Sequence, residues 1–275
     1  MVNSIRFVGC VCDTSKRIVS VYAYNGSDPK GRCNLKALHD WAVTPKEAAR
    51  LQETLAGKLL HAWDGREVRI IAGVDVSVKD GRSRAAVVLL SFPELEPMAS
   101  VCSEMPTPFP YVPGLLTFRE GPAVLEAWDR LPETPDLVFF DGQGIAHPRH
   151  IGLAAHLGLW LDLPSIGCAK SRLYGTYEVP GPRKGDVSAL HDEQDRSVVI
   201  GSVVRTRENV KPLFVSPGHR IDVENAVRFT LACCRRLRLP EPTRRAHRVA
   251  GGENLPKSNA QSGCDRSETV QSRRV

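Results

Sequence analysis

The pattern of apolar and polar positions predicts one helix followed by three strands in the first half of the chain. Thr44, Pro45 and Glu47 form a capping box with proline in the first helical turn, and apolar residues then recur at helical spacing. Three apolar runs with short polar links follow, which predicts an antiparallel meander. These runs cover residues 70–78, 85–92 and 98–104.

The second half of the chain mixes further strands with helices. Continuous apolar runs predict buried strands, and apolar residues at helical spacing predict helices. The strands are expected at 136–140, 165–169 and 197–205, and the helices from Gly121-Pro122 onward, at about 149–159 and at 222–237. A polar loop is expected over residues 175–196. This order indicates an α/β fold with a mixed β-sheet and helices on both faces.

The two ends of the chain differ from this core. Residues 1–40 are expected to form an N-terminal extension, which is either a small hairpin or a poorly ordered segment. Beyond about residue 250 the composition is rich in Arg, Ser, Gly and Asn, which predicts a disordered basic tail over residues 250–275. The main folded domain is therefore expected to cover residues 41–249.

The composition is that of an ordinary globular protein. Of the 275 residues, 42% are hydrophobic and 25% are charged, which excludes a wholly disordered, collagenous or coiled-coil chain. The sequence has no apolar run of the length that a membrane-spanning helix needs. The eight cysteines lack the spacing of a zinc site and are expected to be reduced thiols. We expect a cytoplasmic protein without a membrane contact, and a monomer.

The net charge of +6 comes from the two ends of the chain. Lys and Arg outnumber Asp and Glu in residues 1–40 and 240–275, whereas residues 41–239 carry equal numbers. Net charge alone therefore does not indicate nucleic-acid binding, which would need a local basic patch.

Four polar side chains stand where apolar segments end or are interrupted. Asp75 lies inside an apolar strand, Asp141 closes another, and Glu120 and His219 precede predicted helices. Together they would form an oxygen-rich site with one imidazole, which suits Mg²⁺ or Mn²⁺. Each has a simpler explanation: an outward-facing strand residue for Asp75, a turn for Asp141, the helix dipole for Glu120 and a loop for His219.

A proline-rich segment over residues 107–114 presents one aromatic ring. Tyr111 stands between Pro110 and Pro113, and a stiff loop with an exposed ring is suited to insertion between bases. The alternative is a loop that packs its own aromatic side chains.

Further residues could contact a flat, charged ligand. Gly142, Gly144 and Gly152 would let the backbone approach such a ligand closely, although their spacing does not make a dinucleotide fingerprint. Lys170 follows a predicted strand and could meet a phosphate, or could simply face solvent.

Seven short motifs, taken in order, resemble those of the endonuclease V family over residues 41–248. They are Gly73-Val-Asp-Val-Ser77, Pro110-Tyr-Val-Pro-Gly114, Phe118-Arg-Glu120, Asp141-Gly-Gln-Gly-Ile-Ala-His147, Ile166-Gly-Cys-Ala-Lys-Ser171, Ser216-Pro-Gly-His219 and Leu239-Pro-Glu-Pro-Thr-Arg244. The set is specific as a whole. Cys168 stands where the family more often has valine.

The resemblance implies an RNase H-like fold and a Mg²⁺-dependent endonuclease that tolerates Mn²⁺. Such an enzyme recognises deaminated purines, chiefly deoxyinosine in DNA. It hydrolyses the second phosphodiester bond 3′ to the lesion and leaves 3′-hydroxyl and 5′-phosphate ends. Two alternatives stay open: an endoribonuclease for inosine-containing RNA, and an RNase H-like module that binds nucleic acid without cutting it.

The resemblance also implies roles for individual residues. The metal ligands and acidic catalytic residues fall on Asp75, Glu120, Asp141 and His219, with Asp222 as the alternative to His219. The wedge tyrosine falls on Tyr111, next to Pro113, and Lys170 is both catalytic and nucleic-acid-binding. The residues expected around the base are Leu116, Gly142, Gly152 and Leu153.

Overall fold

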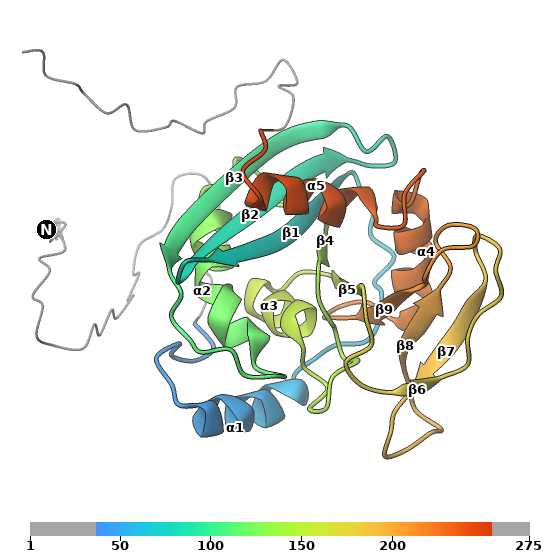
Figure 1. Cartoon of the computed structure of the whole chain (residues 1–275), viewed down its shortest axis with the longest axis horizontal. Coiled ribbons are helices and arrows are strands. Elements are labelled where there is room, and N and C mark those ends of the chain that lie inside the picture. The colour runs from blue at the N-terminus through green and yellow to red at the C-terminus, as the bar shows by residue number, and fades with distance from the viewer. Residues whose placement is uncertain (1–36, 255–275) are drawn as a thin grey trace, which may run out of the picture. The chain divides into compact units, whose positions relative to one another are not determined.

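The computed structural model describes residues 37–254, which form a mixed sheet flanked by helices (Figure 1). The helices are α1 (Pro45–Ala56), α2 (Leu116–Trp128), α3 (Leu153–Leu161), α4 (Val223–Cys233) and α5 (Glu241–Ala250). The strands are β1 (Ile70–Lys79), β2 (Arg82–Ser91), β3 (Pro97–Pro106), β4 (Leu137–Phe140), β5 (Ser165–Ala169), β6 (Thr176–Tyr177), β7 (Val187–His191), β8 (Val199–Val204) and β9 (Leu213–Pro217). Most of the predicted extension and tail lies outside the described residues, so the domain boundaries stay predictions.

The strands pair in the order β3-β2-β1-β4-β5-β9-β8-β7-β6. β1, β2 and β3 form the predicted antiparallel meander, β4 runs parallel to β1, and β5 runs parallel to β4. Within the first five positions of the sheet, β2 alone is reversed. This arrangement confirms the expected α/β fold with an RNase H-like mixed sheet.

Alternate residues of the central strands belong to two separate cores. Ile71 of β1 and Phe139 of β4 pack with side chains of α4 and α5, whereas Ala72 and Phe140 pack with those of α2 and α3. Successive side chains of a strand point to opposite faces, so helices cover both faces of the sheet as expected. Figure 1 shows α5 lying over β1 and β2, two strands that it contacts directly. α1 packs against α3, farther from the sheet.

The predicted start of α2 at Gly121-Pro122 is wrong. The helix begins at Leu116, and Pro122 lies inside it. Gly121 serves close packing instead, because a Cβ atom there would lie 2.7 Å from the indole of Trp41. Glu120 is therefore held within a helix, at some distance from the helix start.

Other predictions fail at their boundaries. The expected polar loop over 175–196 contains the short strands β6 and β7, and α3 begins at Leu153 rather than near residue 149. α4 ends at Cys233, earlier than expected. Helix α5 was not predicted from the sequence, although proline is tolerated in a first helical turn and Pro242 lies there.

Candidate active site

Two aspartates lie side by side at one edge of the sheet. The parallel pairing of β1 with β4 sets Val74 beside Phe140, so the next residue along each chain is Asp75 and Asp141, respectively. Because side chains alternate, both aspartates belong to the face covered by α5. Lys170, which directly follows β5, places Nζ 2.5 Å from Oδ2 of Asp141. The structure thus brings three of the predicted site residues together.

A histidine from the last helix lies beside the aspartates. His247 Nδ1 is 2.7 Å from Oδ2 of Asp75. Asp75, Asp141 and His247 each offer one possible ligand atom, and these atoms lie within 4.8 Å of one another. In the part of the chain that the structure describes, no other set of three or more His, Cys, Asp or Glu side chains meets this condition.

Close packing of α5 on β1 brings His247 to this position. A Cβ atom at Gly73 would lie 2.0 Å from the carbonyl oxygen of Pro242, so only glycine allows the helix to approach the strand this closely. Glu241 in the first turn of α5 forms ion pairs with Arg244 and Arg245, 2.5 and 3.2 Å long. These ion pairs lie within α5 and stabilise its first turns, whereas the contact at Gly73 sets the helix against the strand that carries Asp75.

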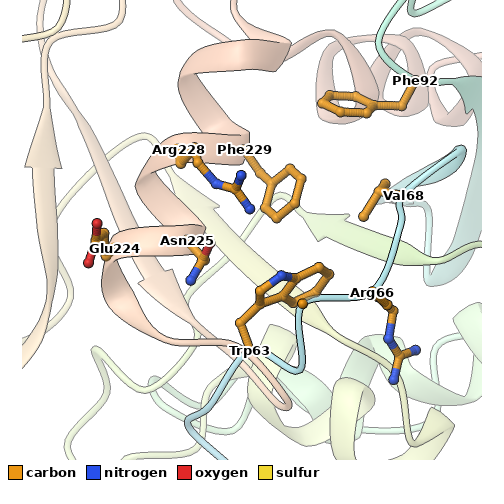
Figure 2. Close-up of a pocket in the computed structure, with 9 residues that line it drawn as sticks. Trp63, Arg66, Val68, Phe92, Glu224, Asn225, Arg228 and Phe229 are labelled. Atoms are coloured by element: carbon orange, nitrogen blue, oxygen red, sulfur yellow. The ribbon is translucent and has the colours of Figure 1, made fainter.

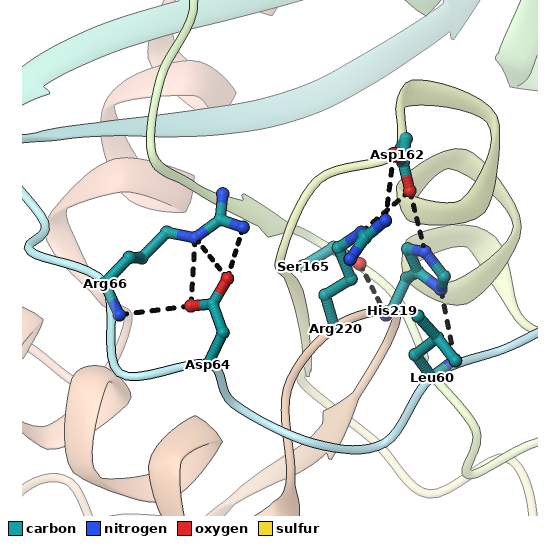
Figure 3. Close-up of polar contacts among 7 residues, drawn as sticks. All are labelled: Leu60, Asp64, Arg66, Asp162, Ser165, His219 and Arg220. Atoms are coloured by element: carbon teal, nitrogen blue, oxygen red, sulfur yellow. Dashed lines mark hydrogen bonds and ion pairs between the residues drawn. The ribbon is translucent and has the colours of Figure 1, made fainter.

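His219, which was predicted as a metal ligand, makes its contacts outside the group of Asp75, Asp141 and His247. Its Nε2 donates to Oδ1 of Asp162 at 3.2 Å and its Nδ1 accepts the backbone N–H of Leu60 at 3.3 Å, as Figure 3 shows. Asp162 also pairs with Arg220 on the same side of the figure. Both ring nitrogens of His219 thus hold the segment after α1 against the end of α3. The histidine beside the acidic pair is His247.

Asp222, the alternative to His219, has a structural role. It is the N-cap residue of α4, and its Oδ1 accepts the backbone N–H of Asn225 at 2.8 Å. A carboxylate at this position satisfies a backbone donor that the helix leaves unpaired.

Negative charge is concentrated around the aspartates. Burial, followed by the charges of Asp75 and Asp141, raises the pKa of Glu120 to about 8. Burial, followed by the charge of Asp141, also raises the pKa of Asp75. Glu120 therefore lies within electrostatic reach of the other two carboxylates, although it comes from α2 on the opposite face of the sheet.

The residues present fit a divalent cation. Asp75, Asp141 and His247 offer two carboxylates and one imidazole, with the carboxyl group of Glu120 in electrostatic reach, and such an oxygen-rich set suits Mg²⁺ or Mn²⁺. Lys170 pairs directly with this group, yet burial first and then repulsion between the carboxylates raise the pKa values of Asp75 and Glu120. A bound cation would relieve that repulsion.

The proline-rich loop exposes the predicted wedge residue. Tyr111 is 74% exposed, whereas Phe109 two positions earlier is buried with α1 and Phe118. The Arg119 guanidinium donates to the carbonyl oxygen of Phe109 at 3.2 Å. The loop therefore packs one aromatic ring into the core and leaves the other free for a partner. Pro113 is exposed near Tyr111.

The residues expected around the base come together beneath this loop. A Cβ atom at Gly142 would lie 3.1 Å from a methyl group of Leu153, and one at Gly152 would lie 2.5 Å from the carbonyl oxygen of Gln143. Leu116 packs against the cluster that contains Leu153. These contacts agree with a shared site and leave its ligand a proposal.

Comparison with known proteins identifies the family. The family model of endonuclease V matches residues 53–248. The endonuclease V of Alkalilimnicola ehrlichii is 52% identical over 226 residues, which cover 81% of this chain and 98% of that protein. The chain belongs to the endonuclease V family.

Solved structures of the endonuclease V family share the fold. The Streptomyces avermitilis endonuclease V is 41% identical with a TM-score of 0.72, over 77% of this chain and 93% of that one. A variant of the Ciona intestinalis endonuclease V, bound to a 23mer DNA with an inosine followed by a ribo-adenosine, is 25% identical. Its TM-score is 0.66, over 76% of this chain and 97% of that one.

The family motifs did not reveal an arginine next to Lys170. Nη2 of Arg238 donates to the backbone carbonyl oxygens of Lys170 and Pro212, at 2.7 and 2.8 Å. Burial lowers the pKa of the Arg238 guanidinium, and the charge of Asp141 opposes that shift. Nε of Arg238 is buried without a hydrogen-bond partner. Arg238 therefore fixes the strand end that carries Lys170. Its position just before α5 gave no signal, because it stands in an arginine-rich run typical of a solvated surface.

A pocket of about 560 Å³ lies among other residues of this endonuclease V fold (Figure 2). Its aromatic lining comes from Trp63, Phe92 and Phe229, and Arg228 stacks on Phe229 with 4.5 Å between the guanidinium carbon and the ring centre. None of the predicted site residues lines it.

The described residues include no helix that is both long and apolar enough to cross a bilayer.

Proposed function

We propose that this chain is a divalent-metal-dependent endonuclease that recognises a deaminated purine in DNA, chiefly hypoxanthine in deoxyinosine. It hydrolyses the second phosphodiester bond 3′ to the lesion and leaves 3′-hydroxyl and 5′-phosphate ends. Membership of the endonuclease V family supports this function, and so does the inosine-containing DNA bound by the Ciona intestinalis relative.

The acidic group supplies the site of hydrolysis. Asp75, Asp141 and His247 would hold Mg²⁺ or Mn²⁺, with Glu120 nearby. When bound there, such a cation would supply Lewis-acid chemistry, which activates water and offsets negative charge on the reacting phosphate. The Lys170 ammonium, held beside Asp141, offsets further charge on that phosphate.

Recognition would use the proline-rich loop and the glycines below it. A purine must leave the stack before its edge can be read, and an inosine pair is weaker than a normal pair, so extruding it costs less. The exposed ring of Tyr111 would fill the gap in the stack. The backbone at Gly142 and Gly152, which packs closely on Leu153 and Gln143, would line the site of the extruded base together with Leu116.

The observation that carries the proposal is the meeting of Asp75, Asp141 and His247 within 4.8 Å. A module that only binds nucleic acid has no need for such a concentration of carboxylates. The test is single-turnover nicking of a DNA duplex with one deoxyinosine, with Mg²⁺, with Mn²⁺ and with chelator, against a matched undamaged duplex. Cleavage that ignores the inosine or persists in chelator contradicts the proposal.

The same experiment should include an RNA strand with one inosine. The ribo-adenosine in the Ciona intestinalis complex favours this second substrate, because it places a 2′-hydroxyl next to the inosine in a bound strand. Faster cleavage of RNA than of DNA would identify the chain as an inosine-specific endoribonuclease.

We further propose that the enzyme acts as a monomer in the cytoplasm. Cys168, Cys233 and Cys234 are free thiols, which is usual in a reducing compartment. Light scattering during gel filtration tests the oligomeric state, and fractionation of cells tests the compartment.

A further inference from the structure

A buried glutamine on α1 connects the two loops that would hold the extruded base. Gln52 is fully buried, and the other buried side chains of α1 are the apolar Ala48 and Leu55. Burying a side-chain amide is unfavourable unless each polar atom is hydrogen-bonded. The partners of Gln52 therefore show what this side chain does.

The amide of Gln52 contacts both loops at once. Its Nε2 donates to the carbonyl oxygen of Gly114, at the end of the wedge loop, at 3.0 Å, and to that of Ile151, just before Gly152, at 3.2 Å. Its Oε1 accepts the Nε–H of Arg149 at 2.6 Å. Carbonyls only accept and a guanidinium only donates, so these partners fix the orientation of the amide.

The carbonyl oxygen of Gly114 is the centre of this network. Besides Gln52, it accepts from Nε2 of His147 at 2.9 Å and from Nη2 of Arg149 at 3.0 Å. His147 Nδ1 accepts the backbone N–H of Arg149, so its Nε2 carries the proton. Burial lowers the pKa of His147 to about 4, so the ring is neutral at physiological pH.

Gly114 is the residue type that this network requires. Its φ of +79° is in the left-handed region, and a Cβ atom there would lie 2.9 Å from Nη2 of Arg149 and 3.3 Å from Nε2 of His147. Gly114 ends the segment that carries Tyr111, and Leu116 begins α2 two residues later. The donors therefore hold the wedge loop at a set position relative to residues 142–152.

We propose that Gln52 is a positioning residue for lesion recognition, which sets the wedge residue Tyr111 in register with the base site. This inference rests on the proposed function of both loops. A duplex substrate needs the ring and the base site at one fixed separation, because the ring must enter the stack while the base occupies its site. A single-stranded substrate has no stack to fill and does not need that register.

The test compares Gln52→Leu with the wild-type protein on two substrates. Gln52→Leu should lower kcat/KM about tenfold or more on an inosine duplex, because small misplacements of binding groups are costly, and should change it far less on an inosine single strand. Gln52→Glu should lose as much on the duplex. It keeps an acceptor for Arg149 but turns an oxygen towards the carbonyls of Gly114 and Ile151.

Thr44→Ala is the matched control on the same helix. It removes the capping box of α1, in which the Thr44 hydroxyl and the Glu47 carboxylate satisfy backbone donors, without touching the Gln52 network. It should lower the thermal midpoint and leave the ratio of duplex to single-strand rates unchanged. Circular dichroism of each variant verifies that it is folded.

A double-mutant cycle separates positioning from general weakening. If Gln52 acts through the wedge loop, Gln52→Leu should add little to the loss that Tyr111→Ala already causes on the duplex. Independent losses that multiply, or equal losses on both substrates, overturn the inference. A wild-type protein without inosine preference instead contradicts the proposed function, so the two failures are distinguishable.

Discussion

Nδ1 of His247 lies 2.7 Å from a carboxylate oxygen of Asp75, although 172 positions separate the two residues in the chain. The contact joins the first strand of the sheet to the last helix of the described domain. It also places an imidazole beside the two aspartates. The sequence motifs had assigned that role to His219. The two histidines therefore have different predicted effects when they are replaced.

Replacing the two histidines should separate metal binding from stability. His247→Ala should weaken Mn²⁺ binding and lower nicking by about 10- to 100-fold or more, because it removes a ligand from the acidic group. His219→Ala should instead lower the free energy of unfolding by about 1–3 kcal/mol, since Asp162 and Leu60 lose a buried partner. Calorimetric Mn²⁺ titration and urea denaturation measure the two effects. The assignment fails if the His219 variant loses Mn²⁺ affinity while the His247 variant keeps it.

The two aspartates should both be essential for cleavage. Asp75→Asn and Asp141→Asn keep the side-chain volume but remove a charge from the site, so each should reduce nicking to background without unfolding the protein. Asp162→Asn is a matched control, because Asp162 pairs with Arg220 and His219 outside this group. Single-turnover nicking with saturating Mg²⁺ is the measurement. Substantial Mg²⁺-dependent activity in either site variant contradicts the metal assignment.

The pH dependence of metal binding should report the state of Glu120. Burial and the neighbouring aspartates raise its pKa from 4.5 to about 8, so the folded metal-free protein holds a proton at pH 7 that the unfolded chain has lost. The contribution of Glu120 to folding is therefore present below about pH 4.5 and is lost as the pH rises towards 8. A cation binds the ionised carboxylate, so metal binding should release a proton from Glu120. The metal affinity should therefore increase as the pH rises over the same range.

Calorimetry at pH 7 in two buffers of different ionisation enthalpy counts the released protons. The wild-type protein should release a larger fraction of a proton than Glu120→Gln, which has no carboxyl group to ionise. Equal proton release by the two proteins would show that Glu120 is already ionised and does not titrate with the metal.

Tyr111 should matter for duplex DNA more than for a single strand. Base stacking on an aromatic ring contributes about 1–3 kcal/mol, so Tyr111→Ala should lower kcat/KM on an inosine duplex by about tenfold to 100-fold. Single-strand cleavage should change much less. Val179→Ala removes a side chain of similar exposure, 75%, and should leave both rates unchanged. Equal losses on both substrates would indicate a folding defect.

The sequence predicted the acidic pair because strands leave a strong local pattern. Asp75 interrupts one apolar run and Asp141 ends another, and parallel neighbouring strands bring such positions to one edge. Lys170 followed from the same reasoning on β5. The central sheet and the capped helix α1 could be predicted equally well, because the sequence pattern of each element lies within about ten residues.

The sequence analysis missed His247 because it missed the helix that carries it. Pro242, Ala246, Val249 and Ala250 recur at helical spacing and are buried in the structure, but no helix was predicted from this pattern. His219 was chosen instead because it follows a buried strand, as a site residue often does. Its contacts with Leu60 and Asp162 are long-range, and no local pattern contains them.

The close approach of Pro242 to Gly73 has a consequence for how this nuclease is made. The strand with Asp75 leaves the ribosome well before the helix with His247, which follows 172 residues later. Until that helix has been synthesised and has docked on the glycine, the chain carries its carboxylates without the imidazole. A nascent chain, or a product truncated before α5, therefore lacks a complete cutting site. We therefore expect nuclease activity to depend on a finished domain in which the last helix has docked.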